Sequence, residues 1–82
     1  MATGYSVPDV HDDISMEVTL ELGGHRRRWV IAPAIHGEDL WSYRVVTVQR
    51  VMVGALRARP DALAKRREFD EEIAIARAEG WK

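Results

Sequence analysis

The sequence of 82 residues contains no cysteine. Disulfide bonds and thiolate metal sites are therefore excluded, and the composition suits a reducing compartment. No apolar run approaches the roughly 20 residues that a membrane-spanning helix needs. The first residues also lack a basic start followed by an apolar stretch, which a secretory signal would show. These absences predict a cytoplasmic protein that does not contact a membrane.

Neither sign of charge is in excess, because 12 Lys and Arg stand against 13 Asp and Glu, giving a formal net charge of −1. General nucleic-acid binders are basic, so this balance argues against that class. The charges are unevenly distributed, with an acidic first quarter, a basic middle and an acidic stretch at 68–72. A local basic surface therefore stays open as a hypothesis.

The composition changes near residue 13. Residues 1–13 contain Gly4, Pro8 and three aspartates with few apolar side chains, so we expect a flexible or partner-ordered acidic tail. Residues 14–82 are predicted to form a single small α+β domain. A domain of this length is near the lower size at which a chain folds without disulfide bonds, a bound metal ion or a second copy.

The clearest structural pattern is a β-hairpin. Residues 14–22 alternate apolar and polar side chains, a two-glycine step follows at 23–24, and residues 25–32 form a second β-prone run. A two-residue turn at the glycines places Val18 opposite Trp29. One face of the hairpin then collects the apolar side chains Ile14, Met16, Val18, Leu20, Leu22, Trp29 and Ile31.

The rest of the domain is predicted to be helical. Apolar residues recur at three- and four-residue steps from Trp41 to Leu56, after two acidic residues that suit a helix N-terminus, and this pattern indicates a long amphipathic helix. A third strand over 42–53 is the alternative, because five valines lie there. Pro60 suits the first turn of a second, C-terminal helix, which Gly80 would end in a left-handed conformation. The predicted fold is thus ββαα.

These elements have more apolar surface than one copy is expected to hide. A lone hairpin is marginal in water and leaves both edges open, and the predicted long helix is apolar on more than one side. We therefore expect a homodimer, formed through this helix or by pairing strand edges across a two-fold axis. The alternative is that the C-terminal helix alone covers the surplus surface.

Arginines supply the candidate binding residues. The hairpin register places Arg26 opposite Glu21 and Arg28 opposite Thr19, and leaves Arg27 on the apolar side without a local partner. We predict a non-enzymatic protein-interaction module, a regulator, inhibitor or assembly factor of the kind that phages and mobile elements encode. Its predicted partner-binding residues are Arg26, Arg27, Arg28, Tyr43, Arg44, Arg50 and Arg57. The alternative is a nucleic-acid-binding accessory protein that uses the arginine-rich hairpin and a basic helix face.

Sequence patterns for catalysis and for cofactor or metal binding are absent. A hard cation could be gathered by four tail residues, Asp9, His11, Asp12 and Asp13. Their spacing lacks the later bidentate glutamate of a calcium loop, so a solvated tail is the simpler interpretation. The predicted helix start is adjoined by His36, Glu38 and Asp39, without a nucleophile beside them. The glycine pair at 23–24 is a hairpin turn rather than a phosphate-binding loop. We expect no enzyme activity, no cofactor and no metal.

Overall fold

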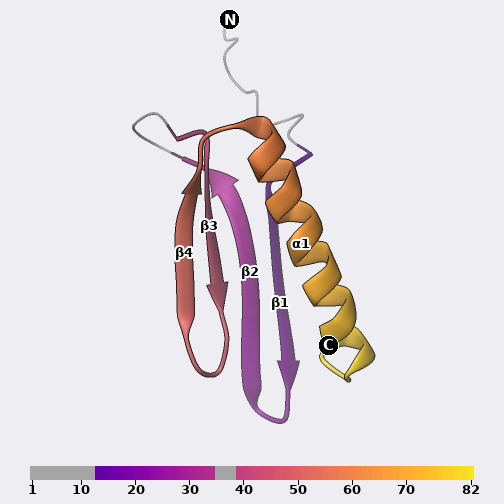
Figure 1. The fold of residues 1–82 in the computed structure, drawn as a ribbon. Coiled ribbons are helices and arrows are strands. Elements are labelled where there is room, and N and C mark those ends of the chain that lie inside the picture. The colour runs from indigo at the N-terminus through magenta and orange to yellow at the C-terminus, as the bar shows by residue number, and fades with distance from the viewer. Residues whose placement is uncertain (1–12, 35–38) are drawn as a thin grey trace, which may run out of the picture.

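The computed structural model describes residues 13–34 and 39–82. Four strands precede one helix, and their bounds are β1 Met16–Leu22, β2 His25–Pro33, β3 Trp41–Val46, β4 Val51–Leu56 and α1 Arg59–Ala78. The strands form one antiparallel sheet in the order β1-β2-β3-β4, so each strand pairs with the next along the chain (Figure 1). The α+β class is confirmed. Of the predicted acidic tail, only Asp13 lies within the described residues.

The predicted hairpin and its register are confirmed. β1 and β2 pair with Val18 opposite Trp29, and Glu21 opposite Arg26. Gly23 and Gly24 have φ angles of 59° and 83°, which a turn matching the right-handed strand twist requires. The two glycines therefore fix which β2 side chains face each side of the sheet.

The predicted long helix is wrong, because its residues form β3 and β4. The alternative of strand structure over 42–53 is closer, although the chain makes two strands there instead of one. Their turn lacks glycine: the Thr47 hydroxyl oxygen accepts hydrogen bonds from the backbone N–H groups of Gln49 (3.3 Å) and Arg50 (3.2 Å). β3 also pairs with the free edge of β2, which a hairpin followed by helices would leave open.

Instead of the two predicted helices, the described residues contain one, α1, with Pro60 in its first turn. Gly80 follows it with a φ of 109°, and the N–H groups of Gly80 and Trp81 bond to the carbonyl oxygens of Arg77 and Ala76. These two bonds form a Schellman motif, so the predicted glycine end of the helix is confirmed. Trp81 then packs against the core.

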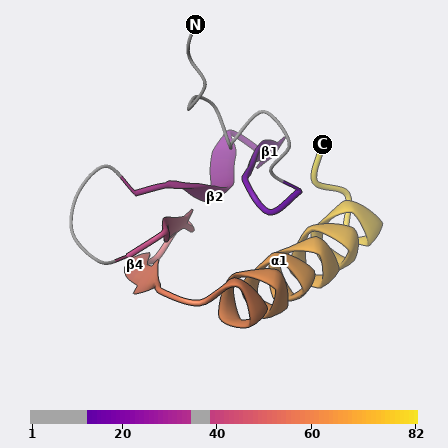
Figure 2. The same cartoon turned by 90° about the horizontal axis from the view of Figure 1, so that it is seen from above.

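The core lies between α1 and one face of the sheet. The sheet contributes Leu20, Trp29, Ile31, Val45 and Leu56, and the helix contributes Ala62, Phe69, Ile73 and Ala76. Trp29 is fully buried, and its indole N–H donates to the Glu72 carboxylate at 3.0 Å. Figure 2 shows α1 on one side of the sheet, and the other side, here called the outer face, carries no second layer from the described residues.

Candidate interaction surface

The predicted partner-binding residues are divided between the two faces of the sheet. Because side chains alternate along a strand, Arg26 and Arg28 of β2 point to the outer face, and Arg27 between them points to the helix side. On β3, Arg44 shares the outer face, since it pairs with Val30, and Tyr43 faces α1. The seven residues therefore do not form one site.

Arg27 stacks between two tryptophans. Its guanidinium carbon lies 5.0 Å from the centre of the Trp29 ring and 5.2 Å from that of Trp81. Its Nε is buried and has no hydrogen-bond partner among the described residues. The cation-π contacts, each worth about 0.5–1 kcal/mol, explain why this arginine needs no carboxylate. Arg27 consequently belongs to the packing between hairpin and C-terminus.

Tyr43 is likewise a packing residue. Its ring contacts Phe69 edge-to-face at 6.0 Å between centroids, and the Lys65 ammonium lies 4.5 Å from the ring centre. The same ring lies over Gly54 of β4, where an added Cβ would approach the ring atoms to 2.5 Å. Gly54 is thus the residue that lets Tyr43 cover this part of the sheet.

Several predicted arginines are balanced by carboxylates. Arg26 pairs with Glu21 at 3.1 Å, Arg28 pairs with Glu17, and Arg57 pairs with Asp39 at 2.9 Å. Exposed pairs of this kind are worth less than about 1 kcal/mol, but they reduce the local positive charge.

Arg44 and Arg50 form no ion pair with another described residue. Arg50 follows the turn between β3 and β4, away from the centre of the sheet. Arg44 lies on the outer face between Val30 and Val53, because those two residues are its cross-strand neighbours. Of the predicted arginines, Arg44 is the one that combines a central position with an unbalanced charge.

Four valines surround Arg44 and form what we call the valine strip: Val30, Val46, Val51 and Val53. Val30 and Val46 are half-buried, whereas Val51 and Val53 of β4 are 53% and 65% exposed. Exposed apolar side chains that adjoin one another indicate an interaction site more strongly than scattered ones. The strip was not predicted from the sequence, because its residues in β3 and β4 were expected to lie in a helix.

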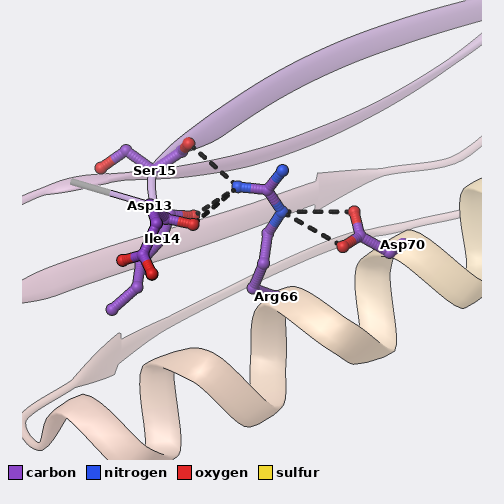
Figure 3. A network of polar contacts seen from close by, with 5 residues as sticks. All are labelled: Asp13, Ile14, Ser15, Arg66 and Asp70. Atoms are coloured by element: carbon purple, nitrogen blue, oxygen red, sulfur yellow. Dashed lines mark hydrogen bonds and ion pairs between the residues drawn. The ribbon is translucent and has the colours of Figure 1, made fainter. Parts of the chain in front are cut away.

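The two edges of the sheet differ. At the β1 edge, the Arg66 guanidinium donates at 3.2 Å to the carbonyl oxygens of Asp13, Ile14 and Ser15, and its Nε donates to Asp70 (Figure 3). At the other end of β1, the Lys82 N–H donates to the Glu21 carbonyl at 3.1 Å. The start of β1 is therefore tied to α1, and its other end to the segment that follows α1.

The β4 edge has no such contacts in the described part of the chain. β4 is the last strand of the sheet, and its sequence VMVGAL contains no charged residue and no proline. Lysines, prolines and covering segments are the usual devices that protect an edge strand from pairing with another chain. β4 thus keeps an unprotected apolar edge next to the valine strip.

The described part of the chain lacks the features of a metal site and of a membrane-spanning helix. Residues 13–34 and 39–82 contain no group of three or more His, Cys, Asp or Glu that could hold a metal ion. Over the same ranges, no helix is both long and apolar enough to cross a membrane. The possible cation ligands of the tail up to Asp12, together with His36 and Glu38, lie outside the described residues. No family model, curated protein or solved structure matches the chain.

Proposed function

We propose that this chain is a non-enzymatic protein-interaction module that binds a partner protein through the outer face of its sheet. The observation that carries the proposal is the valine strip, which adjoins Arg44 on a face without a second layer from the described residues. Within the strip, Val53 is 65% exposed. Covering the strip would remove apolar surface from water at about 25 cal/mol per Å².

The chemistry of the outer face favours a protein partner. The centres of protein interfaces are apolar, depleted in charge and enriched in arginine, and the valine strip with Arg44 has this composition. A fitting partner would present apolar side chains and one carboxylate, placed to receive the Arg44 guanidinium. A regulator, inhibitor or assembly factor in the cytoplasm, phage-encoded or from a mobile element, would act in this way.

Nucleic-acid binding is less well supported. Arg26 and Arg28 lie beside Glu21 and Glu17, and Arg27 stacks on Trp29 behind the sheet. The three consecutive arginines consequently do not present one phosphate-binding face. We expect no measurable binding to duplex or single-stranded nucleic acid at about 50 mM salt, where phosphate contacts are strongest. Tight binding that falls by orders of magnitude towards 200 mM would favour this alternative.

Capture from the cells that produce the protein tests the proposal. Val46→Lys places a charge inside the valine strip, and Ala74→Lys places the same charge on an exposed position of α1. We expect a partner that the unchanged protein and Ala74→Lys retain equally and that Val46→Lys loses at least tenfold, with circular dichroism showing both variants folded. Equal retention by all three proteins, or retention of nothing above an empty resin, would contradict the proposal.

A further inference from the structure

We infer that β4 pairs antiparallel with β4 of a second copy, across a two-fold axis at Val53, so that one sheet runs through both copies. The inference is independent of the proposed function, because it concerns the edge of one strand and needs no partner protein on the outer face. An occupant of an open edge can be any extended segment. Three features of β4 favour the same strand of another copy.

The first feature is the direction of the free backbone groups. The Thr47 N–H bonds to the Arg50 carbonyl at 2.9 Å, so this pair belongs to the hydrogen-bonded set of the β3–β4 ladder. Hydrogen-bonded pairs alternate with non-bonded ones along an antiparallel ladder. Met52 and Gly54 therefore bond towards β3, and the N–H and C=O groups of Val51, Val53 and Ala55 point away from it. The same rule places the Glu21 carbonyl on the outside of β1, where it accepts the Lys82 N–H.

The second feature is the symmetry of these outward groups. With the axis at Val53, Val53 of one copy lies opposite Val53 of the other. Val51 of each copy then lies opposite Ala55 of the other copy, so this pair occurs twice. All three outward residues then exchange backbone hydrogen bonds with outward residues of the second copy. Moving the axis to Met52 or Gly54 would bring Gln49 or Arg57, outside the strand, into the pairing. The Val53 register is thus the one in which the outward N–H and C=O groups of β4 bond only to outward groups of the second β4.

The third feature is the fit of the side chains in this register. The outer face would join valines and alanines, with no like charges opposed. On the helix side, Met52 would lie opposite Gly54 of the second copy, so a large side chain meets a position without Cβ. Met52 is 44% exposed in one copy, and the Tyr43 ring over Gly54 offers it an aromatic surface. β1 could not pair with itself in this way, because Glu17 and Glu21 lie along its edge.

Sedimentation equilibrium from about 1 to 300 µM tests the inference, since a six-residue edge predicts a weak, concentration-dependent dimer. We expect the mass to rise from 9.3 kDa to twice that value. Val53→Lys, which opposes two lysines at the axis, should weaken the dimer at least tenfold. Val46→Lys has the same charge on the same face but one strand further in, and it should leave the dimer unchanged. A single-chain mass throughout, or equal weakening by both lysines, would overturn the inference.

Cysteine cross-linking tests the register, because the natural chain has no cysteine. Residues opposed in a hydrogen-bonded pair have Cα atoms about 5.5 Å apart, within the range of a disulfide. Val53→Cys should therefore form a covalent dimer on oxidation. Val51→Cys and Ala55→Cys should cross-link when mixed, and much less when each is alone. A Val51→Cys protein that cross-links with itself as fast as Val53→Cys does would refute this register. Self-association and partner capture are separate readouts, so either proposal can fail while the other stands.

Discussion

Replacing Gly54 by alanine should destabilise the fold only while the Tyr43 ring is present. The Cβ of an alanine would lie 2.5 Å from Cε2 and 2.6 Å from Cζ and Oη of that ring. Distances this short force the ring to move. Its contacts with Phe69 and Lys65 would be lost or strained as a result.

The expected magnitude follows from two opposing effects. Overpacking a fitted site costs about 1–3 kcal/mol. Replacing glycine in a strand returns roughly 0.5–1 kcal/mol, since the unfolded chain loses freedom. Gly54→Ala should therefore lower the free energy of unfolding by about 1 kcal/mol in the natural chain, the difference between the middle values of the two effects. Tyr43→Val removes the three clashing atoms and keeps a strand-forming residue. In that background Gly54→Ala should be neutral or stabilise by up to about 1 kcal/mol.

The coupling between Gly54 and Tyr43 is measured by urea unfolding, followed by circular dichroism at one protein concentration. Four proteins are compared: the natural chain, Gly54→Ala, Tyr43→Val and the double variant. We expect Gly54→Ala to lower the free energy of unfolding in the natural chain, and to raise it or leave it unchanged in the Tyr43→Val background. Additivity within about 0.5 kcal/mol would show that Tyr43 and Gly54 do not share the space between β3 and β4. The packing described for this corner of the sheet would then be wrong.

Three smaller perturbations can be measured by the same unfolding assay. Arg66→Met removes the bonds to the three carbonyl oxygens before β1 and should cost about 1–2 kcal/mol after allowance for partial exposure, whereas Asp70→Asn, which keeps those bonds, should cost under about 0.5. Equal costs would mean that the ion pair, and not the carbonyl contacts, stabilises this region. Gly80→Ala should cost about 1 kcal/mol, because the φ of 109° disfavours a side chain even though an added Cβ would meet Leu22 at an ordinary contact distance of 3.8 Å; no change would place this residue outside the left-handed region. Glu21→Gln should change stability by less than about 0.5 kcal/mol, since both partners of the Glu21–Arg26 pair are mostly exposed, and a larger loss would contradict that view of the pair.

The hairpin could be predicted from sequence because its turn is encoded locally. Gly23 and Gly24 supply the positive φ angles, and the alternation before them supplies the register. The same holds for the end of α1, where Gly80 and Trp81 act within one turn. Local chemistry was sufficient in both places.

β3 and β4 were missed for an equally local reason. Their turn depends on the Thr47 hydroxyl oxygen, which accepts hydrogen bonds from the backbone N–H groups of Gln49 and Arg50. In a glycine turn the backbone conformation alone forms the turn. Trp41, Val45 and Val48 also happen to be spaced as on a helix, while Trp41, Tyr43 and Val45 alternate as in a strand. The valines of this segment favour a strand over a helix. The strand forms because it can pair with the open edge of β2.

The candidate surface was only partly predictable. Arg44 and the outer-face positions of Arg26 and Arg28 follow from alternation once the strands are known. The stacking of Arg27 between Trp29 and Trp81 joins residues far apart in sequence, so no spacing rule could indicate it. The valine strip and the unprotected β4 edge required the sheet order itself.

Amide hydrogen exchange at the three outward residues of β4 tests the open edge most directly. At protein concentrations of a few micromolar, the N–H groups of Val51, Val53 and Ala55 should exchange quickly, and those of Met52 and Gly54 should be protected by β3. At several hundred micromolar the three outward amides should become protected as well, while the rest of the sheet is unchanged. Protection of all five amides at high dilution, or fast exchange of the outward three at every concentration, would contradict an edge that a second copy closes.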